Sequence, residues 1–251
     1  MAEVTWLGHA GLLVEVDGAR VLLDPLLTRR QRHLRRHGPL PDPDVRRADL
    51  VVISHAHADH LHRPSLRRVA RSSPGVPVVV PRGAAPYVAG LGLGRVVEVV
   101  PGDALEVAGL ALTVTDAVHH GGRTKRDRGS TETVGYVLER AGRRLYFAGD
   151  TDLFDAMADL DGIDLAAIPI SGWWKRLGPG HLDEARAAEA VARVDPTRVL
   201  PIHWGTYSPE DLRLRIPRWA VANGRRFAEE LARRGLEDRL VRLEPGQTAR
   251  W

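Results

Sequence analysis

The sequence predicts an α/β protein in which two packed β-sheets carry helices on their outer faces. Short runs rich in β-branched residues dominate the first two thirds of the chain, and helical periodicity becomes clear towards the end. The runs form two groups, each followed by helical segments, which is typical of layered sheets with outer helices. Because 251 residues suffice for one large core, a single domain over residues 1–251 is expected.

The strands are predicted from short apolar runs bounded by turn residues. They are expected at residues 4–7, 12–16, 20–23, 50–53, 76–80, 96–99, 111–115, 133–138, 144–147, 165–168 and 199–202. The pairs Asp17-Gly18 and Ala141-Gly142 favour tight turns, so each is expected to join two neighbouring strands into a hairpin.

Helices are expected at residues 65–71, 153–160, 183–194 and 217–234. The third has the clearest boundaries, because Asp183 can cap its start and Asp195-Pro196 ends it. The segment from Arg29 to Arg47 holds seven arginines, two aspartates and several prolines, so it is interpreted as an exposed loop or lid.

The composition excludes several kinds of chemistry. Without cysteine there can be no disulfide, thiolate zinc site, iron–sulfur cluster or cysteine nucleophile, so any metal must be bound by His and carboxylates. No apolar run approaches the roughly 20 residues of a membrane span, and no basic segment precedes an apolar block as in a secretory signal. A cytoplasmic location is expected. The net charge of only +4, with Lys125 and Lys175 as the only lysines, does not favour a nucleic-acid partner.

Candidate metal ligands directly follow the expected strand at residues 50–53, in the run Ser54-His55-Ala56-His57-Ala58-Asp59-His60. Alternate residues of an extended segment point the same way, so His55 and His57 can reach one cation together. A turn at Ala58 would direct Asp59 and His60 elsewhere, which predicts two adjacent sites. Imidazole and carboxylate suit Zn²⁺ or iron better than Ca²⁺ or Mg²⁺.

Further ligands are expected where other strands end. His119 and His120 follow residues 111–115, Asp150 follows residues 144–147, and His203 follows residues 199–202. Any one of them alone would more simply be a core, surface or turn residue. Their recurrence after strands predicts that they complete the two metal shells.

The cluster, followed by a distant His, an Asp and a final His, resembles the signature of the metallo-β-lactamase superfamily. Four segments resemble the branch that contains ascorbate-6-phosphate lactonase and N-acyl-phosphatidylethanolamine phospholipase D: Trp6-Leu7-Gly8-His9-Ala10, Leu22-Leu23-Asp24-Pro25, Phe147-Ala148-Gly149-Asp150-Thr151 and Pro201-Ile202-His203-Trp204-Gly205-Thr206. The resemblance covers nearly the whole chain. It implies a four-layer αββα sandwich with its metals in a groove at one sheet edge.

The resemblance also implies a role for each candidate ligand. One metal would be bound by His55, His57 and His119, the other by Asp59, His60 and His203, and Asp150 would bridge the two. It places the third ligand at His119 rather than His120. His120 is then a substrate contact, a proton donor or a stacked residue of the groove.

Several residues outside the ligand set have two interpretations each. Asp24 either orients a ligand or only forms a turn. His181 resembles a residue near the groove in lipid-acting relatives, or only precedes the helix at residues 183–194. His9 either lines the groove or is a core histidine. Surface positions are expected for His33, His37 and His62.

The expected function is metal-dependent hydrolysis. Two divalent ions, Zn²⁺ with Mn or Fe as alternatives, would share a hydroxide that attacks a carbonyl carbon or phosphorus. Asp59 would orient the hydroxide, and His181, His120 or water would protonate the leaving group. A redox di-iron role is less expected, because relatives with that activity generally replace the second His of the cluster, here His57, with Glu.

The substrate is expected to be an anionic ester, lactone or phosphodiester, either a small molecule or a lipid. The segment Gly172-Trp173-Trp174-Lys175-Arg176-Leu177 either covers the groove, touches a lipid interface at the membrane periphery, or packs on the fold. Arg123, Lys125, Arg126 and Arg128 are expected either to bind an anionic group or only to form a solvated turn.

Two alternative functions stay open. One is a metal-dependent nuclease, although no aromatics alternate with the arginines at residues 29–47, and the other is a non-catalytic metal-binding protein. The oligomeric state stays open.

Overall fold

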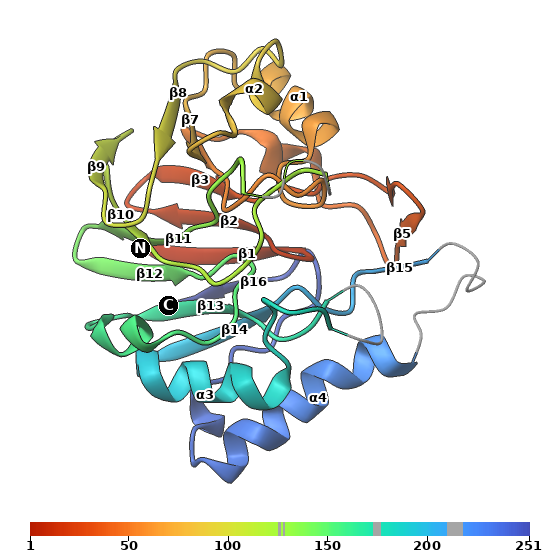
Figure 1. Ribbon diagram of the computed structural model, residues 1–251, viewed down its shortest axis with the longest axis vertical. Helices are drawn as coiled ribbons and strands as arrows, with labels where there is room; N and C mark the ends of the chain where they lie inside the picture. The colour runs from red at the N-terminus through yellow and green to blue at the C-terminus, as the bar shows by residue number, and fades with distance from the viewer. Residues whose placement is uncertain (125–126, 128, 173–176, 210–217) are drawn as a thin grey trace.

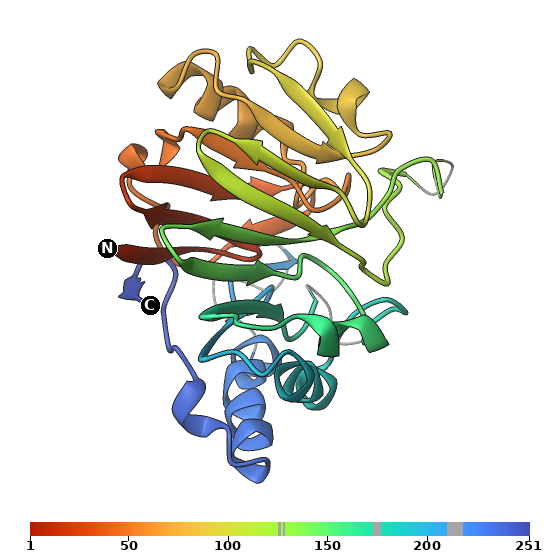
Figure 2. The same cartoon turned by 90° about the vertical axis from the view of Figure 1, so that its left-hand side faces the viewer.

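Two β-sheets lie face to face in the computed structural model, with helices against the outer face of each (Figure 1). The structure describes the whole chain except residues 125–126, 128, 173–176 and 210–217, and it leaves out the side chains of residues 218–221. A view turned by 90° shows the same layering, with the two chain ends close together (Figure 2). This arrangement confirms the four-layer αββα sandwich.

The first sheet combines an antiparallel half with a parallel half. In spatial order its strands are β16 (Thr248–Arg250), β1 (Ala2–Gly8), β2 (Gly11–Val16), β3 (Ala19–Leu23), β6 (Leu50–Val52), β7 (Val78–Pro81) and β8 (Val96–Val99). Pairing is antiparallel from β16 to β3 and parallel from β3 to β8.

The second sheet is built in the same mixed way. In spatial order its strands are β14 (Arg198–Ile202), β13 (Leu165–Pro169), β12 (Arg143–Phe147), β11 (Gly135–Arg140), β10 (Leu110–Thr115) and β9 (Ala104–Val107). Strands β12, β13 and β14 are parallel, and the others pair antiparallel. Strands β10, β12, β13 and β14 therefore all end at the same edge of this sheet.

Side-chain alternation along the strands explains the four layers. On β2, Leu12 and Val14 belong to the core between the sheets, whereas Leu13 packs towards α1 (Arg63–Ser72) and α2 (Ala85–Val88). On β13, Leu165 faces the inner core and Ala166 faces α3 (Glu184–Val194) and α4 (Arg218–Arg233). Each sheet buries both faces, and a fully buried Leu or Val contributes about 1.5–3 kcal/mol.

Most expected elements are present, with ends shifted by a few residues. The third expected helix begins as predicted, because the Asp183 side chain accepts a hydrogen bond from the Arg186 N–H at 2.9 Å. The expected helix at residues 153–160 is wrong, since only a 3₁₀ turn, η2 (Asp155–Asp159), forms there. Phe154 offers it no side-chain cap and Met157 is its one buried residue, so packing does not stabilise a longer helix. Sequence patterns did not indicate β9, β16 or α2.

The interpretation of residues 29–47 as an exposed loop is wrong in part. The segment contains β4 (Arg30–Gln31), β5 (Leu34–Arg36) and the 3₁₀ turn η1 (Pro43–Arg46), and β5 pairs with β15 (Tyr207–Pro209) in a three-stranded sheet. Arg36 is buried, and its guanidinium donates to the carbonyls of Leu7 at 2.7 Å and Pro39 at 2.9 Å. A buried arginine bonded to backbone thus anchors a segment whose composition is typical of a loop.

Within the described part of the chain, no helix is both long enough and apolar enough to cross a bilayer. The cytoplasmic location stays a prediction.

Candidate metal centre

Strand ends from both sheets meet at one place, and the candidate ligands lie in the loops that leave them. The segment after β6 carries His55 to His60, and the segments after β10, β12 and β14 carry His119, Asp150 and His203. Carboxyl ends of parallel strands share one edge of a sheet, where ligands of α/β proteins typically bind. The structure therefore brings together all seven residues that the sequence analysis selected.

The first group consists of His55, His57 and His119, whose ligand atoms all lie within 4.8 Å of one another. His119 Nε2 is 3.2 Å from His57 Nδ1, and His55, which is fully buried, packs its ring against both. Three imidazoles converge here, with no carboxylate among them.

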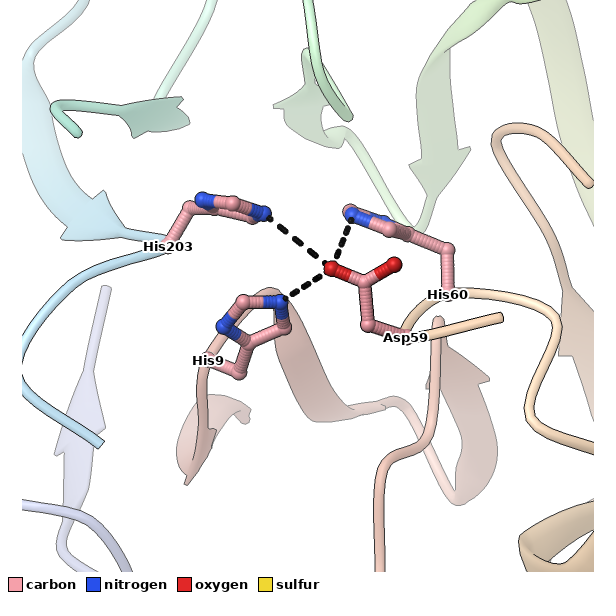
Figure 3. A group of neighbouring side chains, drawn as sticks. All are labelled: His9, Asp59, His60 and His203. Carbon is pink, nitrogen blue, oxygen red and sulfur yellow. Dashed lines mark hydrogen bonds and ion pairs between the residues drawn. The ribbon is translucent and has the colours of Figure 1, made fainter. Parts of the chain in front are cut away.

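The second group surrounds the Asp59 carboxylate (Figure 3). The Nε2 atoms of His60 and His203 each lie 3.8 Å from Asp59 Oδ2. A residue outside the predicted ligand set, His9, approaches the same oxygen at 2.9 Å. His60 and His203 are almost completely buried, and the side chain of Asp59 is 18% exposed.

Asp150 lies between the two groups. Its Oδ2 is 3.3 Å from His60 Nε2 and 4.0 Å from His55 Nε2, and its Oδ1 is 3.3 Å from His203 Nε2. The carboxylate is thus within reach of both groups at once, as a bridging ligand would be.

Buried atoms without hydrogen-bond partners indicate what this centre accommodates. Among the described residues, such atoms include Nε2 of His55, His60 and His203, and Oδ1 of Asp150. A buried polar group without a partner is destabilising by about 1–3 kcal/mol. Lone pairs of imidazoles and carboxylates that converge on one space suit a transition-metal ion such as Zn²⁺, so the donor set fits the expected cofactor.

Hydrogen bonds on the far side of the rings hold the imidazoles in place. His60 Nδ1 donates to Asp24 Oδ2 at 2.7 Å, His119 Nδ1 to the Gly180 carbonyl at 2.8 Å, and His203 Nδ1 to the Ser171 carbonyl at 3.0 Å. Because Nδ1 of each ring makes this outer hydrogen bond, Nε2 is the atom that faces the centre.

Asp24 is more than a turn residue. It is fully buried with a φ of +39°, and its Oδ1 accepts the Ser54 N–H at 2.8 Å while its Oδ2 accepts the Ser54 hydroxyl. The Ser54 hydroxyl in turn accepts from His55 Nδ1 at 2.9 Å. One carboxylate therefore orients His60 directly and His55 through a serine.

Burial and mutual charge set the protonation of the centre. Burial lowers the pKa of His119 to about 4 and the pKa of His55 well below its usual value. Burial also opposes charge on His60, but Asp150, Asp59 and Asp24 outweigh it and raise the pKa of His60 well above the usual value. The first group is therefore neutral at pH 7, whereas the second holds a proton that a metal ion must displace.

A cavity of about 500 Å³ opens directly onto the centre. His57, Asp59 and His119 line it on one side, and His120 and His181 also border it. His181 is half-buried, with its Nε2 3.6 Å from Asp150 Oδ2, whereas His120 is exposed. The two candidate proton donors thus differ in how closely they approach the centre.

Several expectations about surface and anion-binding residues have mixed outcomes. His62 is buried, contrary to expectation, because its Nδ1 bonds the Ser65 hydroxyl at 2.7 Å as it caps α1. Arg123 lines the cavity, but its guanidinium also donates to the carbonyls of Ala56 and Leu61, both at 3.0 Å. Outside the described residues lie Lys125, Arg126, Arg128, Trp173, Trp174, Lys175 and Arg176.

Sequence reasoning missed the contact of His9 with Asp59, because the residues lie 50 positions apart. A signal was present, since His9 lies two residues after the strand-like run at residues 4–7, as the candidate ligands follow other strands.

Comparison with known proteins agrees with the fold and the site. A family model described as a beta-lactamase superfamily domain matches residues 19–204. A UPF0173 metal-dependent hydrolase from Methanopyrus kandleri is 32% identical over 254 residues, covering 98% of this chain and 98% of that protein. The chain belongs to the metallo-β-lactamase superfamily and, within it, is a metal-dependent hydrolase.

Two further similarities extend this comparison. N-acyl-phosphatidylethanolamine-hydrolyzing phospholipase D 1 from Caenorhabditis elegans is 31% identical over 226 residues, covering 81% of this chain and 64% of that protein. The solved structure of a metallo hydrolase from the archaeon Ignicoccus hospitalis matches with a TM-score of 0.73 at 23% identity, covering 100% of this chain and 98% of that one. The similarity to the Ignicoccus hospitalis structure supports the fold.

Proposed function

We propose that this hydrolase, a single domain over residues 1–251, uses two divalent metal ions to cleave an anionic ester, lactone or phosphodiester. The observation that carries the proposal is the convergence of four unpartnered buried donor atoms, from His55, His60, His203 and Asp150, beside a cavity large enough for a small substrate. Zn²⁺ is the ion that this donor set favours, with Mn and Fe as alternatives.

Each ion would be bound by one group and share Asp150. His55, His57 and His119 would hold the first, and Asp59, His60 and His203 the second. Bound there, the ions would supply a water whose pKa is lowered towards about 7, together with positive charge that stabilises the negative charge developing on the substrate.

The residues around the ions would then divide the remaining work. Asp59, partly exposed to the cavity, would accept a hydrogen bond from the attacking water and orient it. We assign leaving-group protonation to His181, since it borders both the cavity and Asp150. Burial opposes its charge, but the Asp150 carboxylate, 3.6 Å away, raises the pKa of His181 above its usual value, which favours the protonated form that a general acid needs. His120, exposed at the rim, is better placed to contact substrate.

Positive charge on the cavity wall supports an anionic substrate. Arg32 and Arg123 both line the cavity, and each guanidinium can pair with a phosphate or carboxylate. The name of the Caenorhabditis elegans relative states hydrolysis of a phospholipid, so lipid phosphodiesters belong among the substrates to be tested.

The test combines metal analysis with a substrate screen. Protein freed of metal and reloaded with Zn²⁺, Mn²⁺ or Fe²⁺ would be assayed on lactones, phosphodiesters and N-acyl phospholipids, beside an RNA substrate. We expect two ions per chain and turnover of an anionic small molecule or lipid that disappears on chelation. Turnover that persists without metal would overturn the proposal, and turnover of RNA alone would replace it with a nuclease.

A further inference from the structure

His9 lies against the second group of candidate ligands. It forms the turn between β1 and β2 with a φ of +55°, and it is only 3% exposed. Its Nε2 lies 2.9 Å from Asp59 Oδ2, opposite His60 and His203 (Figure 3). Three histidines therefore surround one carboxylate oxygen.

The distances separate His9 from the other two histidines. At 2.9 Å, the His9 contact is a direct N–H···O hydrogen bond. Two donor atoms on one tetrahedral zinc, each about 2.0–2.1 Å from the metal, would instead be about 3.4 Å apart. His60 and His203 stand 3.8 Å away with unpartnered Nε2 atoms, which leaves space for an ion on their side only. A carboxylate oxygen has two lone pairs, so Asp59 Oδ2 can accept from His9 and still face that ion.

His9 is itself held rigidly. Its N–H donates to the Thr206 hydroxyl at 2.8 Å, and its carbonyl accepts from Trp6 Nε1 and from the His203 N–H, both at 2.9 Å. Its ring also packs on the His203 ring, with centroids 4.0 Å apart. His9 thus contacts two members of the second group, Asp59 by its side chain and His203 by its backbone and ring.

We propose that His9 is a positioning residue that holds the Asp59 carboxylate towards the second metal ion. The inference rests on the proposed function, because it requires Asp59 to be a ligand of that ion. Asp59 is the most exposed member of the group, so without this hydrogen bond its carboxylate can turn towards the cavity. Removing such an outer hydrogen bond typically weakens metal binding by about 10- to 100-fold.

Two amide substitutions separate this role from a role in the turn. In His9→Gln the amide nitrogen reaches approximately the place of Nε2, whereas in His9→Asn it stops near the place of Nδ1. Asn adopts positive φ more readily than other residues, so a residue needed only for the turn would be replaced better by Asn. A role through Asp59 demands the opposite order.

The experiment titrates the metal-free protein with Zn²⁺ in competition with a chromogenic chelator. We expect two ions in wild type and in H9Q, and a second-ion affinity about 10- to 100-fold lower in H9N with the first-ion affinity unchanged. His9→Phe, which keeps a ring against His203 but has no donor, should behave like H9N and provides the comparison if H9N does not fold.

The outcomes distinguish this inference from the proposed function. If H9N or H9F binds the second ion as wild type does, or if H9Q is as weak as H9N, the positioning role is wrong while the two-ion site stands. If wild type binds fewer than two ions, the proposed function fails and the inference fails with it.

Discussion

The two halves of the metal centre differ in charge although they lie side by side. The first group is made of three imidazoles, and burial lowers the pKa of each. The second contains Asp59, and the carboxylates of Asp150, Asp59 and Asp24 raise the pKa of His60 well above its usual value. The first group is therefore uncharged before it binds a cation, whereas the second must release a proton to bind one. Asp150 lies between the two groups and is within reach of both.

Asp150→Ala should have the largest effect, because it removes the one carboxylate that both halves share. We expect loss of tight binding at both sites and a fall in kcat/KM of about 100- to 1,000-fold or more. Metal content by elemental analysis, together with turnover, checks this. Asp152→Asn is the matched control: its side chain bonds the Leu153 N–H and pairs with Arg186, so it should retain both ions. Two tightly bound ions in D150A would contradict the bridging role.

Substitution of His181 should separate catalysis from metal binding. His181→Gln is expected to lower kcat by about 100-fold, the smaller end of the range for a lost general acid, with both ions retained. His120→Gln should leave kcat within a few-fold of wild type and alter KM instead. Equal kcat values for H181Q and wild type, measured with a substrate whose leaving group needs protonation, would remove His181 from the mechanism.

Substitution of His119 should affect one half alone. His119→Ala is expected to lose the first ion and keep the second, since only the three-imidazole group loses a donor. His120→Ala, one residue further along, should keep both, and Zn²⁺ titration measures each step. If H120A rather than H119A lost the ion, the assignment between these neighbours would be reversed.

The two halves of the centre should also differ, by a smaller effect, in how their metal affinity depends on pH. The raised pKa of His60 keeps its imidazole protonated at pH values below that pKa, and this proton competes with the second ion. The affinity for the second ion should therefore rise about tenfold for each unit by which the pH increases, up to the pKa of His60. The pKa of His119 is about 4, so the first ion should show little change between pH 6 and 8. Chelator competition at several pH values gives both slopes, and equal slopes would show that the halves do not differ in protonation.

The candidate site was predictable to different degrees along the chain. His55 to His60 could be selected because they are adjacent in sequence and follow a strand, and His119, Asp150 and His203 because the same position recurs after other strands. Their assignment to two ions stays a prediction. For His9 and Asp24 the sequence left two interpretations open, and it could not name their partners Asp59 and His60, which lie 50 and 36 positions away in the chain.

The fold shows the same division. Alternating apolar residues and the capping Asp183 predicted most strands and the helix at residues 183–194, because these patterns are local. The short strands β4 and β5 were not predicted, because they depend on the bond from Arg36 to the carbonyl of Leu7, 29 positions away, and on the pairing of β5 with β15.

The amino-acid order alone determines the layered α/β class, the absence of thiolate chemistry and the cluster from His55 to His60, because each depends on composition or short spacing. Asp150 and His203 were selected by their position after strands, and His119 rather than His120 by the family resemblance. Tertiary structure alone decides which of these side chains share a space, which rings are neutral and which residues hold them in place. The physical reason is that burial, charge and hydrogen bonding act through space, and the packing of two sheets brings together atoms that the chain keeps far apart.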